Sequence, residues 1–189
     1  LVAGDLTTTG VPLEPAGTMT YHELFEIYTE QITALAEAGA DLLVVETMLG
    51  IDEMTVALEA AQSVCALPVL CSMTVQADGS GYFGGTCVEA VETLQELGAA
   101  AVGINCSTGP DQLESLVRNM RQAAKVPLLV KPNAGMPEIS PEGEAIYSMG
   151  PAAFAQHMRT LIDAGAALVG GCCGTDPRYI SALRDVLPR

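Results

Sequence analysis

Glu37-Ala-Gly-Ala-Asp-Leu-Leu-Val-Val-Glu46 contains the pattern on which the fold prediction rests. The glycine is predicted to end a helix, because glycine readily adopts the left-handed conformation that closes helices. The apolar run after it is typical of a buried strand, here ending in a carboxylate. The same helix-to-strand junction returns at Glu96-Leu-Gly-Ala-Ala100 and at Asp163-Ala-Gly-Ala-Ala167. Ala66-Leu-Pro68 and Lys125-Val-Pro127 occupy the equivalent place in the units between.

These junctions recur at intervals of roughly 30 residues, the length of one βα unit. Regular alternation of strand and helix indicates a parallel sheet. The apolar residues are mostly aliphatic, with 4% aromatic residues and no tryptophan, which is typical of buried parallel strands. Six strands are predicted, at residues 1–5, 41–46, 68–73, 101–105, 127–131 and 167–171.

Six units fit either an open doubly wound sheet or part of a barrel. No G-x-G-x-x-G motif follows the first strand, as a dinucleotide-binding sheet would require. Polar residues instead stand at the carboxyl ends of several strands, where (β/α)8 enzymes keep their chemistry. We therefore predict an α/β protein, a (β/α)8 TIM barrel in which about six βα units are present and the first two would precede Leu1. Residues 1–189 are expected to form a single, partial barrel domain.

Local signals mark the helices and loops. Capping boxes are predicted at Thr20–Glu23 and Thr86–Glu89, each pairing a threonine with a glutamate three residues later. Pro110 is expected to open a helix reaching about residue 124, and Pro151 another. Residues 132–150 are predicted to be a long loop that lies over another part of the molecule.

Three cysteines follow predicted strands. Cys172 and Cys173 stand between glycines directly after the last strand, and Cys106 follows the strand two positions away. Carboxyl ends of parallel strands share one edge, so these thiols are expected to converge. Three thiolates make a zinc site with a fourth position open to substrate; a pair of small buried residues at a tight turn is the plainer alternative. The intervening strand would place Asn133 between the cysteines.

Two charged residues also end strands. Glu46 fits either a structural salt bridge or a carboxylate that pairs with a substrate ammonium. Lys131 fits either a Schiff-base lysine or a surface residue supporting the site.

Together, the motifs Gly103-Ile-Asn-Cys-Ser-Thr-Gly-Pro110, Lys131-Pro-Asn-Ala-Gly135 and Gly170-Gly-Cys-Cys-Gly-Thr175 resemble the homocysteine S-methyltransferase family. The Ser-Thr-Gly-Pro and Lys-Pro-Asn-Ala-Gly forms are similar to its cobalamin-dependent methionine synthase branch. The resemblance implies one zinc held by Cys106, Cys172 and Cys173, with Glu46 contacting the homocysteine amino group. It also implies that Asn133 matches a position able to occupy the fourth zinc site when homocysteine is absent.

The implied reaction is transfer of a methyl group to the zinc-activated homocysteine thiol, giving methionine. Methylcobalamin, bound on another domain or on a separate corrinoid protein, is the expected donor. Relatives use S-adenosylmethionine, S-methylmethionine or betaine instead. Two rival hypotheses remain: a Schiff-base or phosphate-binding barrel enzyme using Lys131, and a non-catalytic zinc-binding fragment.

The net charge and the cysteines limit which partners and which cellular compartment the sequence predicts. The formal net charge is −15, which disfavours nucleic acid as a partner. No apolar run is long enough for a membrane span. Six cysteines without a signal peptide pattern indicate a reducing compartment, and a cytoplasmic protein is expected.

Overall fold

A six-stranded parallel sheet forms the centre of the molecule. The computed structural model describes residues 1–187. Each strand after β1 pairs with the strand of the preceding βα unit, in the order β1-β2-β3-β4-β5-β8. The α/β class and the six predicted units are therefore confirmed. The strands are β1 (Ala3–Thr7), β2 (Leu42–Met48), β3 (Val69–Met73), β4 (Ala101–Cys106), β5 (Leu128–Pro132) and β8 (Ala166–Val169).

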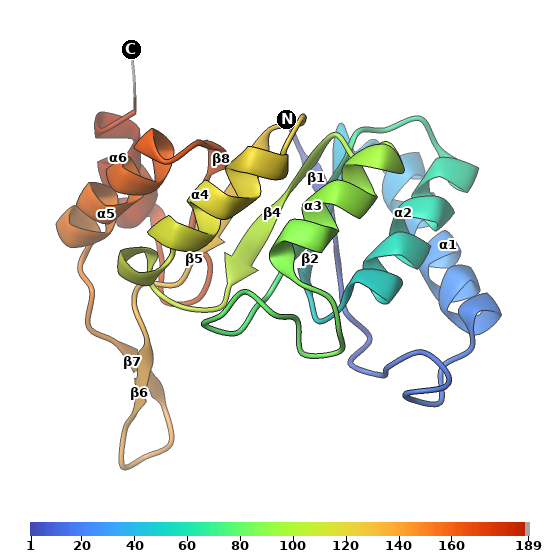
Figure 1. Ribbon diagram of the computed structural model, residues 1–189, viewed down its shortest axis with the longest axis horizontal. Helices are drawn as coiled ribbons and strands as arrows, with labels where there is room; N and C mark the ends of the chain where they lie inside the picture. The colour runs from blue at the N-terminus through green and yellow to red at the C-terminus, as the bar shows by residue number, and fades with distance from the viewer. Residues whose placement is uncertain (188–189) are drawn as a thin grey trace.

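Helices cover one face of this sheet (Figure 1). The helices before the last one lie in connections from the carboxyl end of one strand to the amino end of the next, the right-handed crossover that parallel strands require, and α6 follows the last strand. The helices are α1 (Tyr21–Glu37), α2 (Ile51–Val64), α3 (Cys87–Glu96), the 3₁₀ turn η1 (Pro110–Gln112), α4 (Glu114–Ala123), α5 (Pro151–Asp163) and α6 (Pro177–Asp185).

The two edges of the sheet are β1 and β8, and within residues 1–187 they do not pair with each other. A closed barrel joins its first and last strands, so the described chain is a partial barrel. The face opposite the helices, here called the open face, corresponds to the inside of such a barrel.

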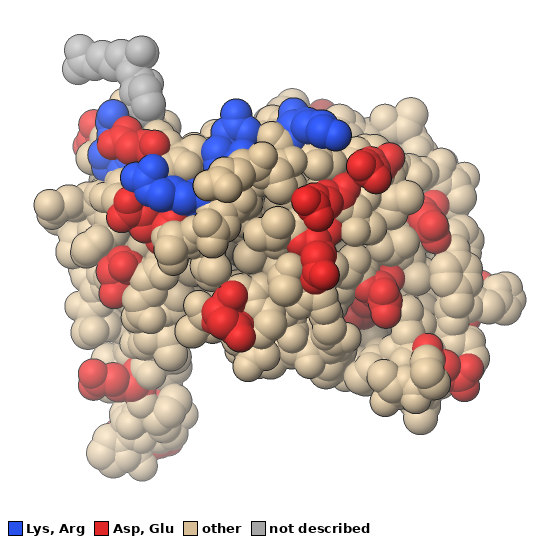
Figure 2. Space-filling model, viewed as in Figure 1, with Lys and Arg blue, Asp and Glu red and all other residues tan. Residues whose placement is uncertain are grey.

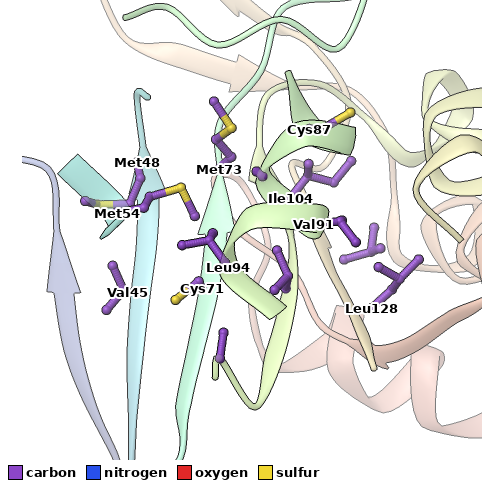
Figure 3. Packing of buried hydrophobic residues seen from close by; sticks show 14 of the residues in the cluster. Val45, Met48, Met54, Cys71, Met73, Cys87, Val91, Leu94, Ile104 and Leu128 are labelled. Atoms are coloured by element: carbon purple, nitrogen blue, oxygen red, sulfur yellow. The ribbon is translucent and has the colours of Figure 1, made fainter. Parts of the chain in front are cut away.

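Alternation along β2 separates the two faces. Leu43 and Val45 are fully buried and point toward the helices, whereas Leu42, Val44 and Glu46 are half-buried on the open face. Figure 3 shows the layer between sheet and helices, where methionines and branched aliphatic side chains from the strands interdigitate with those of α2 and α3.

The loop predicted at residues 132–150 contains a β-hairpin. Strands β6 (Pro137–Ile139) and β7 (Ala145–Tyr147) pair antiparallel. The hairpin projects from the body at the end where the β4 arrow points, the carboxyl end of the sheet (Figure 1). The prediction of a loop lying over the molecule is therefore wrong for most of this segment, although Tyr147 at the base of the hairpin lies against the turn at Gly174.

Two local predictions need smaller corrections. The helix expected from Pro110 to about residue 124 is broken, because a 3₁₀ turn ends before Leu113 and α4 begins after it. The capping box at Thr20 forms in both directions. At Thr86 only the threonine half forms, in which its side chain accepts a hydrogen bond from the Glu89 amide.

Acidic side chains are distributed over the helical face (Figure 2). The basic side chains on this face gather along its upper margin. Among the described helices, none combines the length and apolar character needed to cross a bilayer.

Candidate metal centre and its polar surroundings

The structure brings the three predicted cysteines together at the carboxyl end of the sheet. The sulfurs of Cys106, Cys172 and Cys173 all lie within 4.8 Å of one another. Cys106 Sγ and Cys173 Sγ are 3.6 Å apart. Three sulfurs bound ~2.3 Å from a tetrahedral zinc lie about 3.8 Å apart, so the cluster fits this ion without a large rearrangement.

Cys106 reaches the cluster because the chain turns sharply at the end of β4. Cys106 and Ser107 both adopt the left-handed conformation, with φ of 58° and 60°. Non-glycine residues in this region carry strain and persist where surrounding contacts hold them. Here Ser107 Oγ accepts a hydrogen bond from Val75 N (2.9 Å), and Ser107 N donates to Thr74 Oγ1 (3.2 Å). The end of β3 therefore fixes the turn that carries Cys106.

Cys172 and Cys173 lie in an irregular turn after β8. The strand ends at Val169, so the two cysteines are not constrained to opposite faces. Cys172 N donates to Pro132 O (2.8 Å), and Cys173 N donates to the side-chain oxygen of Asn133 (3.1 Å). Asn133 is thus buried between the cysteine-bearing segments, where its carbonyl holds the backbone of this turn.

Hydrogen bonding within the cluster makes its thiols unequal. Donation from Cys106 lowers the pKa of Cys172 to about 5, and the Cys173 amide and Asn105 contribute in the same direction. The shared bond with Cys172, together with burial, raises the pKa of Cys106. The cluster therefore stabilises a thiolate at Cys172, and thiolates are the form of cysteine that binds zinc.

Asn105 connects the cysteines to the neighbouring strands, and the sequence analysis gave it no separate role. It is buried at the end of β4, and Asn105 Nδ2 lies 3.8 Å from Cys172 Sγ and 2.7 Å from Thr47 Oγ1. Its Oδ1 accepts hydrogen bonds from Thr47 N and Ser72 Oγ, both at 2.8 Å. This network also holds Thr47 in the left-handed conformation, directly after Glu46.

Glu46 and Lys131 form an ion pair across the open face. Their strands, β2 and β5, are separated in the sheet by β3 and β4. The two side chains are 17% and 25% exposed, so the pair is partly shielded from water. Asp5 on β1 lies nearby; its pKa is raised by burial and further by the negative charge of Glu46.

Tyr147, at the base of the hairpin, is a neighbour of the cluster that sequence reasoning missed. Burial and the proximity of Cys173 raise the pKa of this tyrosine. Its ring lies against Gly174, where a Cβ atom would come within 2.3 Å of the ring. No sequence pattern marks this contact, since it depends on how the hairpin folds back onto the turn at residues 172–174.

A parallel βα sheet with three convergent thiols at its carboxyl ends is the arrangement of a partial barrel with a candidate cysteine metal site. Residues 1–187 match the family model described as homocysteine S-methyltransferase, and the chain belongs to this family.

Among curated relatives, methionine synthase from Mycobacterium leprae is 30% identical over 186 residues, which cover 95% of this chain and 15% of the relative. The chain thus spans about 15% of that enzyme's length. The apo structure of the Escherichia coli homocysteine methyltransferase MmuM aligns with a TM-score of 0.79 and 25% identity, covering 99% of this chain and 63% of that one. Its metallated form aligns with a TM-score of 0.67, covering 85% and 51%.

Proposed function

We propose that this chain is the homocysteine-binding part of a zinc-dependent methyltransferase that converts homocysteine to methionine. The observation that carries the proposal is the convergence of the thiols of Cys106, Cys172 and Cys173 at the carboxyl end of the sheet. Family membership and the similarity to a homocysteine methyltransferase solved in a metallated form support it. In this proposal residues 1–189 form a single, partial barrel domain.

The proposed metal ligands are the three cysteines, which leave a fourth position for the substrate sulfur. Zinc bound by these cysteines would supply the Lewis acidity that removes the proton from a thiol ligand at neutral pH. The residues of the chain orient the substrate: Glu46 pairs with its ammonium group, which limits rotation of the amino-acid end and holds the sulfur at attack distance. Asn133 keeps the Cys172–Cys173 turn in place, and in this proposal its side chain takes the fourth zinc position when homocysteine is absent.

The methyl donor in this proposal is methylcobalamin, carried by another domain or by a separate corrinoid protein. Similarity to methionine synthase supports this choice. Six free cysteines fit a reducing compartment, so we place the protein in the cytoplasm, with neither nucleic acid nor membrane as a partner.

The Schiff-base alternative is less well supported by the geometry. A Schiff-base lysine acts as a neutral amine and is commonly desolvated in an apolar pocket or placed beside another cation. Lys131 instead faces the Glu46 carboxylate and is partly exposed. Nothing in such chemistry requires three convergent thiols beside the lysine.

Metal analysis of the reduced chain tests the proposal. We expect one zinc per chain in the wild type and in the control Cys87→Ala, whose cysteine lies buried at the start of α3. Cys106→Ala should lose the metal. Added homocysteine should change the zinc coordination measured by X-ray absorption in the first two proteins. If zinc binds but its coordination does not change when homocysteine is added, the chain is a non-catalytic metal-binding fragment. If the reduced chain binds no zinc, the proposed metal centre is refuted.

A further inference from the structure

The Glu46–Lys131 ion pair is placed where an amino-acid substrate would need two opposite charges. Both residues lie on the open face near the carboxyl ends of their strands. Lys131 is the register partner of Asn105 on β4, and its aliphatic chain passes Gly170 on the other side. It therefore stands between the two segments that carry the cysteines.

Asn105 links the segment that carries Glu46 to the thiol of Cys172. Asn105 contacts Cys172 Sγ through its amide nitrogen, and its oxygen accepts from Thr47 N, the residue that follows Glu46. Asp5 on β1 is close enough to both charges for the Glu46 carboxylate to raise its pKa and for Lys131 to lower it. Lys131 is the cation that faces these two carboxylates.

We propose that Lys131 binds the α-carboxylate of the amino-acid substrate, and that it leaves Glu46 free for the substrate ammonium when it does so. The inference rests on the proposed function, because it assigns a residue to the second charged group of the same substrate. A zwitterion offers one anion to Lys131 and one cation to Glu46. Each partner of the ion pair therefore exchanges one counter-ion for another, and neither charge is left unpaired in a partly shielded place.

This exchange makes the site selective for thiols that carry both charges. A thiol lacking the carboxylate would have to displace Lys131 from Glu46 and leave the lysine without a partner. A thiol lacking the ammonium would leave Glu46 unpaired. Sites built around paired groups discriminate strongly against ligands that lack one of them, because the buried partner is then unsatisfied.

Three thiols separate these contributions: homocysteine, 3-mercaptopropan-1-amine, which lacks the carboxylate, and 4-mercaptobutanoate, which lacks the ammonium. The chain is loaded with Co²⁺ as a spectroscopic probe of the cysteine centre, and the sulfur-to-cobalt absorption band is titrated with each thiol. The variants are Lys131→Met and Lys131→Arg. The control is Lys125→Met, which removes an exposed lysine after α4.

Lys131→Met should lower the affinity for homocysteine about tenfold to hundredfold, the range expected when a charge-assisted hydrogen bond is lost. The same variant should bind 3-mercaptopropan-1-amine as well as the wild type or more tightly, because Glu46 is no longer occupied. Lys131→Arg should recover part of the homocysteine affinity, and Lys125→Met should match the wild type for all three thiols.

Comparing ligands within one protein cancels any general loss of stability. If Lys131→Met weakens the binding of all three thiols equally, or of none of them, the lysine only links β2 to β5 and the inference is wrong. A change in the wild-type cobalt spectrum on adding homocysteine would in that case still support the proposed function. If no thiol changes the wild-type spectrum, the proposed function fails, and the carboxylate role fails with it.

Discussion

Cysteine thiols have opposite pKa shifts on the helical face of the sheet and at its carboxyl end. On the helical face Cys71 is fully buried among aliphatic side chains, and burial raises the pKa of its thiol to about 12 (Figure 3). At the carboxyl end of the sheet Cys172 is half-buried, and hydrogen bonds from Cys106 and others lower its pKa to about 5. Cysteine is therefore a packing residue on the first face and a metal-ligand candidate at the edge of the second. The surroundings of a side chain decide its chemistry.

Alkylation of the metal-free chain would test this contrast, and of the effects predicted here the difference in reaction rate is expected to be the largest. At pH 7 a thiol of pKa 5 is ~99% thiolate, whereas one of pKa 12 is ionised in only about one molecule in 10⁵. Brief treatment with iodoacetamide, followed by mass spectrometry, should modify Cys172 at least a thousandfold faster than Cys71. Because the pKa of Cys172 is lowered, its reaction should persist well below the usual thiol range and fall only near pH 5. A midpoint for Cys172 near pH 8.5 would contradict the hydrogen-bonding account.

The packing difference between the faces can be measured at two adjacent residues of β2. Leu43 is fully buried against the helices, whereas Leu42 is half-buried on the open face. Leu43→Ala should lower the free energy of unfolding by about 2–5 kcal/mol, because it leaves a cavity in a packed layer. Leu42→Ala should cost less than half of that in urea denaturation. Equal costs would mean that the open face is as tightly packed as the helical one.

A smaller effect is expected at Asn105, which contacts Cys172 of the proposed metal centre. Asn105→Ala removes the donor to Cys172 Sγ and releases Thr47. Partners behind a metal ligand commonly contribute tenfold to hundredfold to affinity, and we expect a loss of about this size in a zinc competition titration. The control is Ser72→Ala, which removes one hydrogen bond to the same amide without touching a sulfur. If both variants bind zinc equally, Asn105 does not position Cys172.

The fold and the placement of the cysteines could be predicted because both follow from local signals. Glycine junctions, apolar runs and the Thr20 capping box each act within a few residues, and parallel register then carries the strand ends to one edge. The Glu46–Lys131 pair could not be predicted as a contact, since its partners lie 85 residues apart and meet only through the curvature of the sheet.

The hairpin was not predicted, for a different reason. Its strands are three residues each, too short for a periodic pattern, and most of their side chains are exposed. Without an apolar face to bury, residues 137–147 resemble an ordinary polar loop. The role of Tyr147 beside Cys173 was missed with it.

The unpaired edges of the sheet affect how the chain behaves in concentrated solution. An edge strand presents a row of free backbone donors and acceptors, which natural proteins commonly protect with charge or proline against pairing with other chains. The β1 edge carries Asp5. The β8 edge, Ala166–Val169, has neither a charged residue nor a proline, and the side chain of its Leu168 is exposed. We therefore expect the β8 edge to set the concentration at which the chain begins to aggregate, and light scattering at rising concentration would measure this limit.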